Sequence, residues 1–145
     1  MATFNKFNIF VQDLANGVHN FTPSTGDSLK VYLTNETPSA SADALKADLA
    51  EISAGSGYTS GGNEATISSS LQTSGTYKLV LGDPATWVST GTIGPFRYAV
   101  LYNDTTTMKT KPLIGWWDYG SSVTLANGET FAVDFDAGTG VFTLV

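Results

Sequence analysis

GPFRYAVLYND (residues 94–104) and PLIGWWDYGSSVTLANGETFAVDF (residues 112–135) are the two stretches of sequence that decide the fold. Successive side chains of a β-strand leave on opposite faces, so residues two apart share a face. In the first stretch one face therefore collects four bulky side chains, those of Phe96, Tyr98, Val100 and Tyr102. The opposite face, with Arg97, Ala99 and Leu101, is only partly polar, which predicts a central strand that is covered on both sides.

The second stretch predicts a β-hairpin over residues 121–135. Its last part has an apolar face made of Phe131, Val133 and Phe135. The Asn-Gly pair at 127–128 is the one that best tolerates the positive φ angles of a type I′ turn. Further strands are indicated by short runs that end at turn residues: 28–34, 65–72, 77–81, 86–89 and 141–144.

Two segments have helical spacing instead. Apolar residues recur three and four apart from Phe4 onward, which predicts an amphipathic helix over residues 4–16 with Thr3 as its N-cap. We expect this helix to pack on the sheet of its own domain; alternatively, residues 1–20 form a helical arm that docks on a neighbouring subunit. A second, shorter helix is predicted over residues 41–52.

The chain is expected to fold as a single domain over residues 1–145. A chain of this length buries about 68–70% of its unfolded surface, so it needs no disulfide or metal to hold a core. Many short strands separated by turn residues predict a mainly β protein. We expect an antiparallel β-sandwich, jelly-roll-like or barrel-like, with the N-terminal amphipathic helix and one further short helix.

Composition argues against several classes of function. Seven basic and 13 acidic residues give a net charge of −6, and the basic residues are scattered, so nucleic-acid binding is not expected. The absence of cysteine excludes disulfides and thiolate zinc sites. No segment approaches the ~18–20 apolar residues that span a bilayer, and no secretory signal is recognisable, so we expect a soluble protein without a membrane partner.

Few residues could carry catalysis, and we expect the protein not to be an enzyme. His19 is the one histidine, and no nucleophile motif accompanies it, so a structural role is expected. Asp134 and Asp136 share a strand face, while Asp104 and Asp118 bracket a loop, but no pair is placed at the separation that glycoside hydrolysis requires. The dense spacing of a calcium loop is also missing. We predict no catalytic residue, cofactor or metal.

Trp116, Trp117 and Tyr119 form the strongest aromatic cluster. Adjacent tryptophans of a strand point to opposite faces, so one of them needs a cover outside the central core. That cover is the N-terminal helix or a partner, and a sugar-stacking platform is the alternative. Tyr58, the single aromatic of the glycine-rich loop 53–63, either anchors that loop or contacts a partner. The candidate partner contacts are Phe4, Phe7, Tyr58, Trp116, Trp117 and Tyr119.

Several segments resemble a single family of phage proteins. They are MATFNKFNIFVQDLANGVHNF, SLKVYLTNETP, AEISAGSGYTSGG, GPFRYAVLYND and PLIGWWDYGSSVTLANGETFAVDFD, which together cover nearly the whole chain. The family consists of small proteins encoded among the structural genes of tailed bacteriophages. The resemblance implies a virion structural protein made in the host cytoplasm. In particular, it implies a head decoration or cement protein that binds the major capsid protein on the outer surface of the capsid.

The same resemblance bears on assembly and on chemistry. It brings no catalytic residues, and it implies a homo-oligomer, with a trimer favoured because many such proteins occupy threefold positions. A cement protein stabilises the shell because it binds the assembled state alone. Two other functions stay open: a tail or fibre-attachment subunit of the virion, and a carbohydrate-binding module built on the aromatic cluster.

Overall fold

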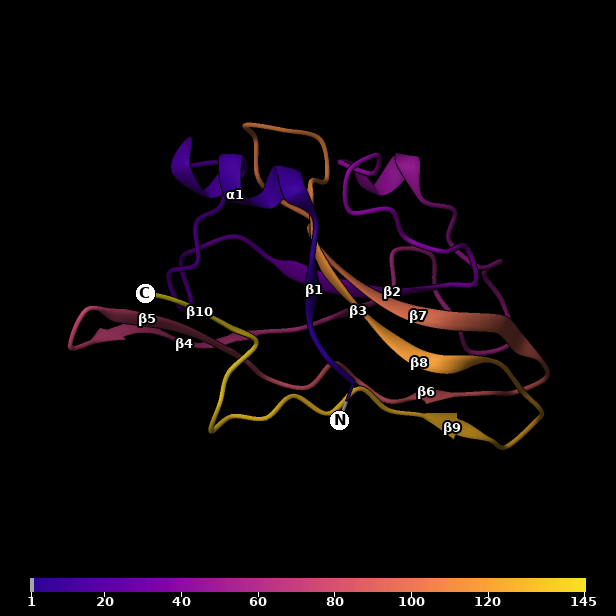
Figure 1. Cartoon of the computed structure of the whole chain (residues 1–145). Coiled ribbons are helices and arrows are strands. Elements are labelled where there is room, and N and C mark those ends of the chain that lie inside the picture. Colours follow the sequence, from indigo (N-terminus) through magenta and orange to yellow (C-terminus); the bar gives the residue numbers. More distant parts are fainter. Residues whose placement is uncertain (1) are drawn as a thin grey trace.

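The protein is mainly β, with antiparallel sheets and one α-helix, in a computed structural model that describes residues 2–145 (Figure 1). The largest sheet has five strands, in the order β1 (Asn5–Lys6), β8 (Leu113–Leu125), β7 (Ile93–Asn103), β2 (Leu29–Thr34) and β3 (Asn63–Glu64). A three-stranded sheet follows the order β10 (Phe142–Leu144), β5 (Thr76–Leu81) and β4 (Ile67–Thr73). The third sheet pairs β6 (Trp87–Val88) with β9 (Thr130–Phe131). The helical elements are α1 (Asn8–Ala15) and the 3-10 turn η1 (Lys46–Asp48).

Strand β7 is central and buried on both faces, as its sequence predicts. Ala99 and Leu101 belong to the larger core cluster, whereas Tyr98, Val100 and Tyr102 belong to a smaller cluster on the opposite face. Phe96 was expected beside Tyr98, but its side chain lies in the larger cluster. The pairing with β8 changes register between these two residues, so strict alternation is lost there.

The predicted hairpin over residues 121–135 is wrong in its pairing. Residues 113–125 form the single strand β8, which pairs with β7, and β9 pairs with β6 instead of turning back on β8. A turn does occur, since the Glu129 N–H donates to the Ala126 carbonyl at 3.0 Å. Only Gly128 has a positive φ there (87°), so the turn is not type I′.

The turn instead forms one side of a corner between two sheets. Ile93 pairs with Leu125 before the corner, and Val88 pairs with Thr130 after it, in the same register. Within the corner the Ser89 N–H donates to the Glu129 carbonyl at 2.9 Å. The strand pairs β7–β8 and β6–β9 are therefore one bent two-stranded ribbon (Figure 1, right-hand side).

Both helix predictions need correction. The N-terminal helix spans residues 8–15 rather than 4–16, because Asn5 and Lys6 pair as a strand with β8. The helix predicted over 41–52 is reduced to the 3-10 turn η1. There the Asp48 carboxylate accepts the N–H groups of Ala44 and Leu45, at 3.0 and 2.8 Å, which closes a turn instead of starting a helix.

The remaining strand predictions are confirmed to within a few residues, by β2, β4, β5, β6 and β10. The barrel-like alternative is wrong, because the described strands form three separate open sheets. No helix within residues 2–145 combines the length and hydropathy that crossing a bilayer requires.

Candidate functional site

An apolar cavity of about 330 Å³ lies between strand β8 and the segment 131–141. Its aromatic lining comes from three parts of the chain and consists of Phe4, Trp117, Tyr119, Phe131 and Phe135. Three of the six predicted contact residues, Phe4, Trp117 and Tyr119, are therefore brought together.

The two tryptophans lie on opposite faces of β8, as predicted. Trp117 packs against the larger core cluster, with its ring 5.3 Å from Phe4 and 5.1 Å from Phe135. Trp116 packs against the smaller cluster, 4.6 Å from the ring of Phe7. The segment before helix α1 thus covers each indole with one phenylalanine.

Small residues make room for this arrangement. Ala99 of β7 is the residue directly paired with Trp117, and its methyl group leaves space for the indole ring. Gly115 lies beneath Phe4, and a Cβ at this position would clash with the Phe4 ring. The cavity wall therefore requires glycine at position 115 because a side chain would not fit there; its φ angle is one that any residue can adopt.

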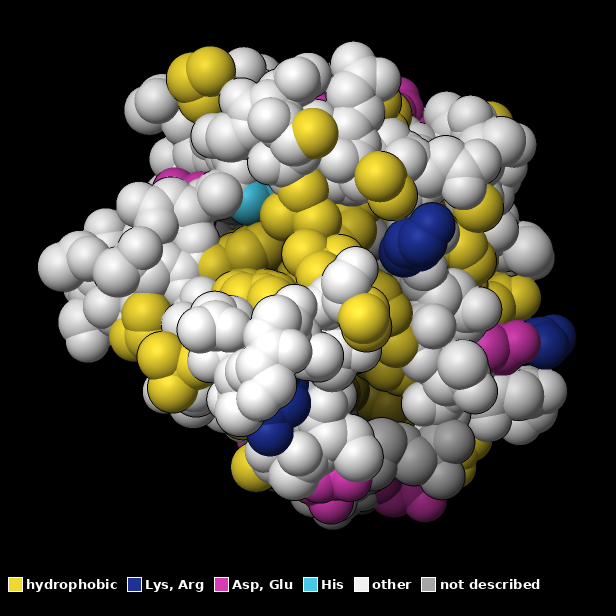
Figure 2. All heavy atoms as spheres, turned by 60° about the vertical axis from the view of Figure 1, so that its left-hand side comes forward, with side chains coloured by type: hydrophobic (Ala, Val, Ile, Leu, Met, Phe, Trp, Pro, Cys, Tyr) yellow, Lys and Arg dark blue, Asp and Glu magenta, His cyan; other side chains and the backbone are white. Residues whose placement is uncertain are grey.

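Aromatic side chains extend beyond the cavity in a continuous series. Phe4 also stacks on Phe142 at 6.0 Å, and Phe142 contacts Phe21, which stacks on the His19 ring at 5.4 Å. Figure 2 shows hydrophobic side chains gathered in a band across this face, beginning at the single histidine. The aromatic lining of the cavity is thus continuous with the larger core cluster.

The charged residues that line the cavity are Arg97, Asp134 and Asp136. Arg97 is neutralised by Asp118, which accepts its Nε and Nη2 donors at 2.8 Å each. Hydrogen bonds from Arg97 and from the Gly120 N–H hold the pKa of Asp118 below its usual value. Asp134 is exposed and makes no hydrogen bond with any residue in 2–145.

The Asp136 carboxylate is held by its own loop. It accepts the N–H of Gly138 at 2.7 Å and that of Thr139 at 3.3 Å, and these bonds lower the pKa of Asp136. Asp134 and Asp136 thus line one cavity, whereas Asp104 lies elsewhere, paired with Lys30 and Lys111. Within residues 2–145 no group of three or more His, Asp or Glu side chains could hold a metal ion.

His19 lies inside the aromatic series. Its Nδ1 is 3.1 Å from the Asn103 amide nitrogen, and its Nε2 is buried with no hydrogen-bond partner among the described residues. Burial lowers the pKa of His19 to about 4, against the opposing effect of Asp13 and Asp27. The ring is therefore neutral at pH 7.

The other predicted contact residues lie within the fold. Phe7 is fully buried and Trp116 half-buried. Tyr58 is 2% exposed, its hydroxyl donates to Glu51 at 2.7 Å, and it accepts the Leu33 N–H at 3.1 Å. Of the two roles considered for Tyr58, these contacts correspond to the anchor of the glycine-rich loop.

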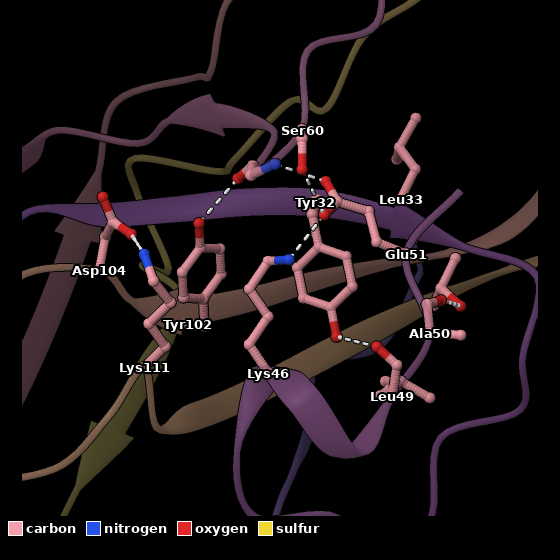
Figure 3. Close-up of polar contacts among 12 residues, drawn as sticks. Tyr32, Leu33, Lys46, Leu49, Ala50, Glu51, Ser60, Tyr102, Asp104 and Lys111 are labelled. Atoms are coloured by element: carbon pink, nitrogen blue, oxygen red, sulfur yellow. Dashed lines mark hydrogen bonds and ion pairs between the residues drawn. The ribbon is translucent and has the colours of Figure 1, made fainter. Parts of the chain in front are cut away.

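A polar cluster centred on Glu51, separate from the aromatic cavity, was not predicted from the sequence (Figure 3). The Glu51 carboxylate accepts hydrogen bonds from Lys46 Nζ (2.6 Å), Ser60 Oγ (3.3 Å) and the Gly61 N–H (2.6 Å), besides that from Tyr58. In Figure 3 the Lys46 and Ser60 side chains both point toward this carboxylate. Sequence spacing could not reveal the cluster, because its members come from the short turn η1 and from the irregular chain that follows it.

A smaller cavity of about 220 Å³ adjoins this cluster. Three lysines line it, and each is paired with a carboxylate: Lys46 with Glu51, and Lys30 and Lys111 with Asp104. The Lys30–Asp104 pair joins strand β2 to a loop, whereas the other two pairs join segments outside the strands to one another. The cluster therefore has a structural explanation.

No protein-family model, curated protein or solved structure matches the chain.

Proposed function

We propose that the protein is a structural component of a phage virion, and specifically a head decoration or cement protein that stabilises the shell by binding the major capsid protein. The observation that carries the proposal is the aromatic cavity, an apolar surface lined by Phe4, Trp117 and Tyr119 on one side and by the segment 131–136 on the other. Such a surface suits binding rather than catalysis. The resemblance of the sequence to virion proteins supports the same role.

We also propose that the five-stranded and three-stranded sheets are the two layers of an antiparallel β-sandwich. The larger core cluster supports this, because it unites inward-facing residues of the first sheet, such as Val31 and Leu101, with Leu79 and Leu81 of the second. A sandwich of this kind is a rigid carrier for a binding surface. Rigidity suits a cement protein, since little conformational entropy is lost on binding.

The stabilising effect of such a protein follows from mass action. A ligand that binds only the assembled shell stabilises it by about 2.7 kcal/mol per site at a free concentration of about 100 times Kd. Many sites on one shell would add these contributions. We therefore expect decorated heads to withstand heat and low ionic strength better than bare heads.

The experiment adds purified protein to heads of the parent phage that lack it and measures co-sedimentation and the temperature of DNA release. We expect the native protein to bind and to raise that temperature. Tyr119→Ala removes an aromatic ring that is 58% exposed at the cavity and should weaken binding by about tenfold. Leu71→Ala, at a 68% exposed position of β4, is the matched control and should bind normally.

A tail or fibre-attachment subunit is the first alternative. If the purified protein binds tails and does not bind heads, the tail role replaces the head role. We further propose a homo-oligomer, with a trimer favoured, and light scattering of the purified protein measures its mass directly.

A carbohydrate-binding module is the second alternative, and one observation favours it. Trp117 and Tyr119 line the same cavity as the exposed Asp134, so aromatic rings and a hydrogen-bonding group lie together. A panel of soluble glycans should then quench tryptophan fluorescence, and Trp117→Ala should abolish the effect. Absence of quenching across the panel would remove this alternative.

A further inference from the structure

The aromatic cavity carries an imbalance of charge. Of its three charged lining residues, Arg97 is neutralised by the two hydrogen bonds to Asp118. Asp134 and Asp136 remain as two carboxylates on one cavity, separated by a single residue in the sequence. Lys78 of β5, a cation on another element, donates to the Gly138 carbonyl at 2.9 Å and does not line the cavity.

Aromatic rings add to this preference for positive charge. The face of an aromatic ring attracts a cation, with Trp the strongest and a guanidinium the most frequent partner. Trp117 and Tyr119 both line the cavity, and Tyr119, whose ring contacts Phe131 on one side, is 58% exposed as a residue. An anionic ligand would be repelled by the two carboxylates. A purely apolar one would add no partner for Asp134, whereas Asp136 already accepts the N–H groups of Gly138 and Thr139.

The size of the cavity further limits which ligands can fit. At about 330 Å³ it lies at the lower end of the range for ligand sites, which is about 300–1,000 Å³. That volume suits one long side chain rather than a stretch of polypeptide. An arginine side chain has an apolar stem for the cavity and a planar, always charged head for the rings and the carboxylates.

We propose that the cavity formed by Phe4, Trp117 and Tyr119 binds an arginine side chain of a partner protein, with Asp134 and Asp136 as its counter-charges. The inference rests on the proposed function, in which the partner is the capsid protein. It specifies the chemistry of the contact. A segment of the partner with an exposed arginine occupies the cavity, and its guanidinium lies between the aromatic rings and the carboxylates.

The test titrates the 145-residue protein with N-acetyl-arginine amide and follows the three indole N–H resonances by NMR. Trp87 is buried and Trp116 faces the other core, so a ligand in the cavity should shift the Trp117 resonance, which Trp117→Phe identifies by its loss. N-acetyl-citrulline amide, which has the same shape without the charge, should bind at least about tenfold more weakly. Binding of the arginine probe should weaken as salt is added.

Two charge variants complete the test. Asp134→Asn should weaken binding of the arginine probe by about two- to fivefold, the range for a partly solvated ion pair. Glu64→Gln removes the same charge from exposed strand β3 and should leave binding unchanged. The proposal would be overturned if the citrulline probe bound as tightly as the arginine probe. It would also be overturned if Asp134→Asn and Glu64→Gln changed binding of the arginine probe to the same extent.

A titration with a neutral sugar tests the carbohydrate alternative. If methyl glucoside shifts the Trp117 resonance to saturation and the arginine probe does not, the site binds carbohydrate and the inference fails. If the arginine probe binds as expected while Asp134→Asn decorates heads normally, the cavity has the proposed chemistry but is not the capsid contact. The failure of the inference and the failure of the proposed function are thus distinguishable.

Discussion

Replacing Glu51 by glutamine exchanges a single side-chain oxygen for an NH₂ group and should destabilise the protein substantially. The Glu51 side chain is 12% exposed and the Lys46 side chain 17%, so their pair at 2.6 Å is largely shielded from water. Glutamine keeps one acceptor oxygen for Tyr58 and Gly61 but turns an NH₂ group toward the Lys46 ammonium. One charge-assisted hydrogen bond is lost, and one partly buried cation is left without its partner.

The magnitude lies between two known limits. Exposed ion pairs contribute up to about 1 kcal/mol, and breaking a fully buried pair costs about 3–5 kcal/mol. A hydrogen bond to a charged group contributes about 1.5–3 kcal/mol. We therefore expect Glu51→Gln to lower the free energy of unfolding by about 2–3 kcal/mol, which corresponds to a decrease in Tm of about 6–12 °C for a domain of this size.

Urea unfolding followed by tryptophan fluorescence measures this change. Lys46→Met and the double variant complete a thermodynamic cycle, in which the coupling energy should exceed about 1 kcal/mol. If Glu51→Gln changed the free energy of unfolding by less than about 0.5 kcal/mol, as ordinary surface substitutions do, the reasoning would be refuted. Strict additivity of the two single variants would also refute it.

The same residue gives the stability a pH dependence. Burial by itself raises the pKa of Glu51, but the hydrogen bonds from Lys46, Tyr58 and Gly61 together bring it below the usual value of 4.5. A carboxyl group with a lowered folded-state pKa stabilises the protein above the unfolded pKa and loses that contribution as pH falls through the folded value. The native protein should thus lose stability more steeply below pH 4.5 than Glu51→Gln does.

Three other predictions concern the cores. Gly115→Ala should displace Phe4 and lower the free energy of unfolding by about 1–3 kcal/mol, with a red shift of tryptophan emission as Trp117 becomes more exposed. A normal emission spectrum would contradict it. The folded-state pKa of His19, about 4, is below its ordinary 6.5, so protonation favours the unfolded state and stability should fall as pH decreases from 6.5 to 4. His19→Phe should flatten that part of the stability curve, by on the order of 2 kcal/mol, and an unchanged slope would show that His19 is not its source. Because Trp87 Nε1 is buried without a partner among residues 2–145, Trp87→Phe should cost about 1 kcal/mol or less in urea unfolding, against about 3–5 for Trp87→Ala. A loss for Trp87→Phe as large as that for Trp87→Ala would contradict this prediction, because a phenyl ring would then not replace the packing of the indole.

Alternation predicted the central strand and the split between Trp116 and Trp117, because both depend only on the geometry of a single strand. It failed at Phe96, where a change of register against β8 moves the side chain to the other core. Gly94 and Pro95, directly before Phe96 within β7, are residues typical of such an irregularity, but the alternation argument took no account of them. The helix expected over 41–52 failed for a different reason, since the Asp48 carboxylate satisfies the backbone donors that a helix would have used.

The sequence predicted that aromatic residues form the site, but not which of them line the cavity. Aromatic type alone nominated Phe4, Trp117 and Tyr119, and the fold brings them to one cavity. The same criterion also nominated Tyr58, which is buried because Glu51 fixes its hydroxyl. Whether an aromatic side chain lies at the surface is decided by contacts between residues distant in the sequence.

The bent ribbon that joins the sheets has a mechanical consequence. Force applied to the β7–β8 pair passes into the β6–β9 pair along two covalent chains that run in parallel, held together at the corner by the Ser89 and Glu129 backbones. Separating the two pairs therefore requires extension of both chains at once. Under the proposed role on a pressurised shell, this corner would distribute a tensile load over two strands rather than one.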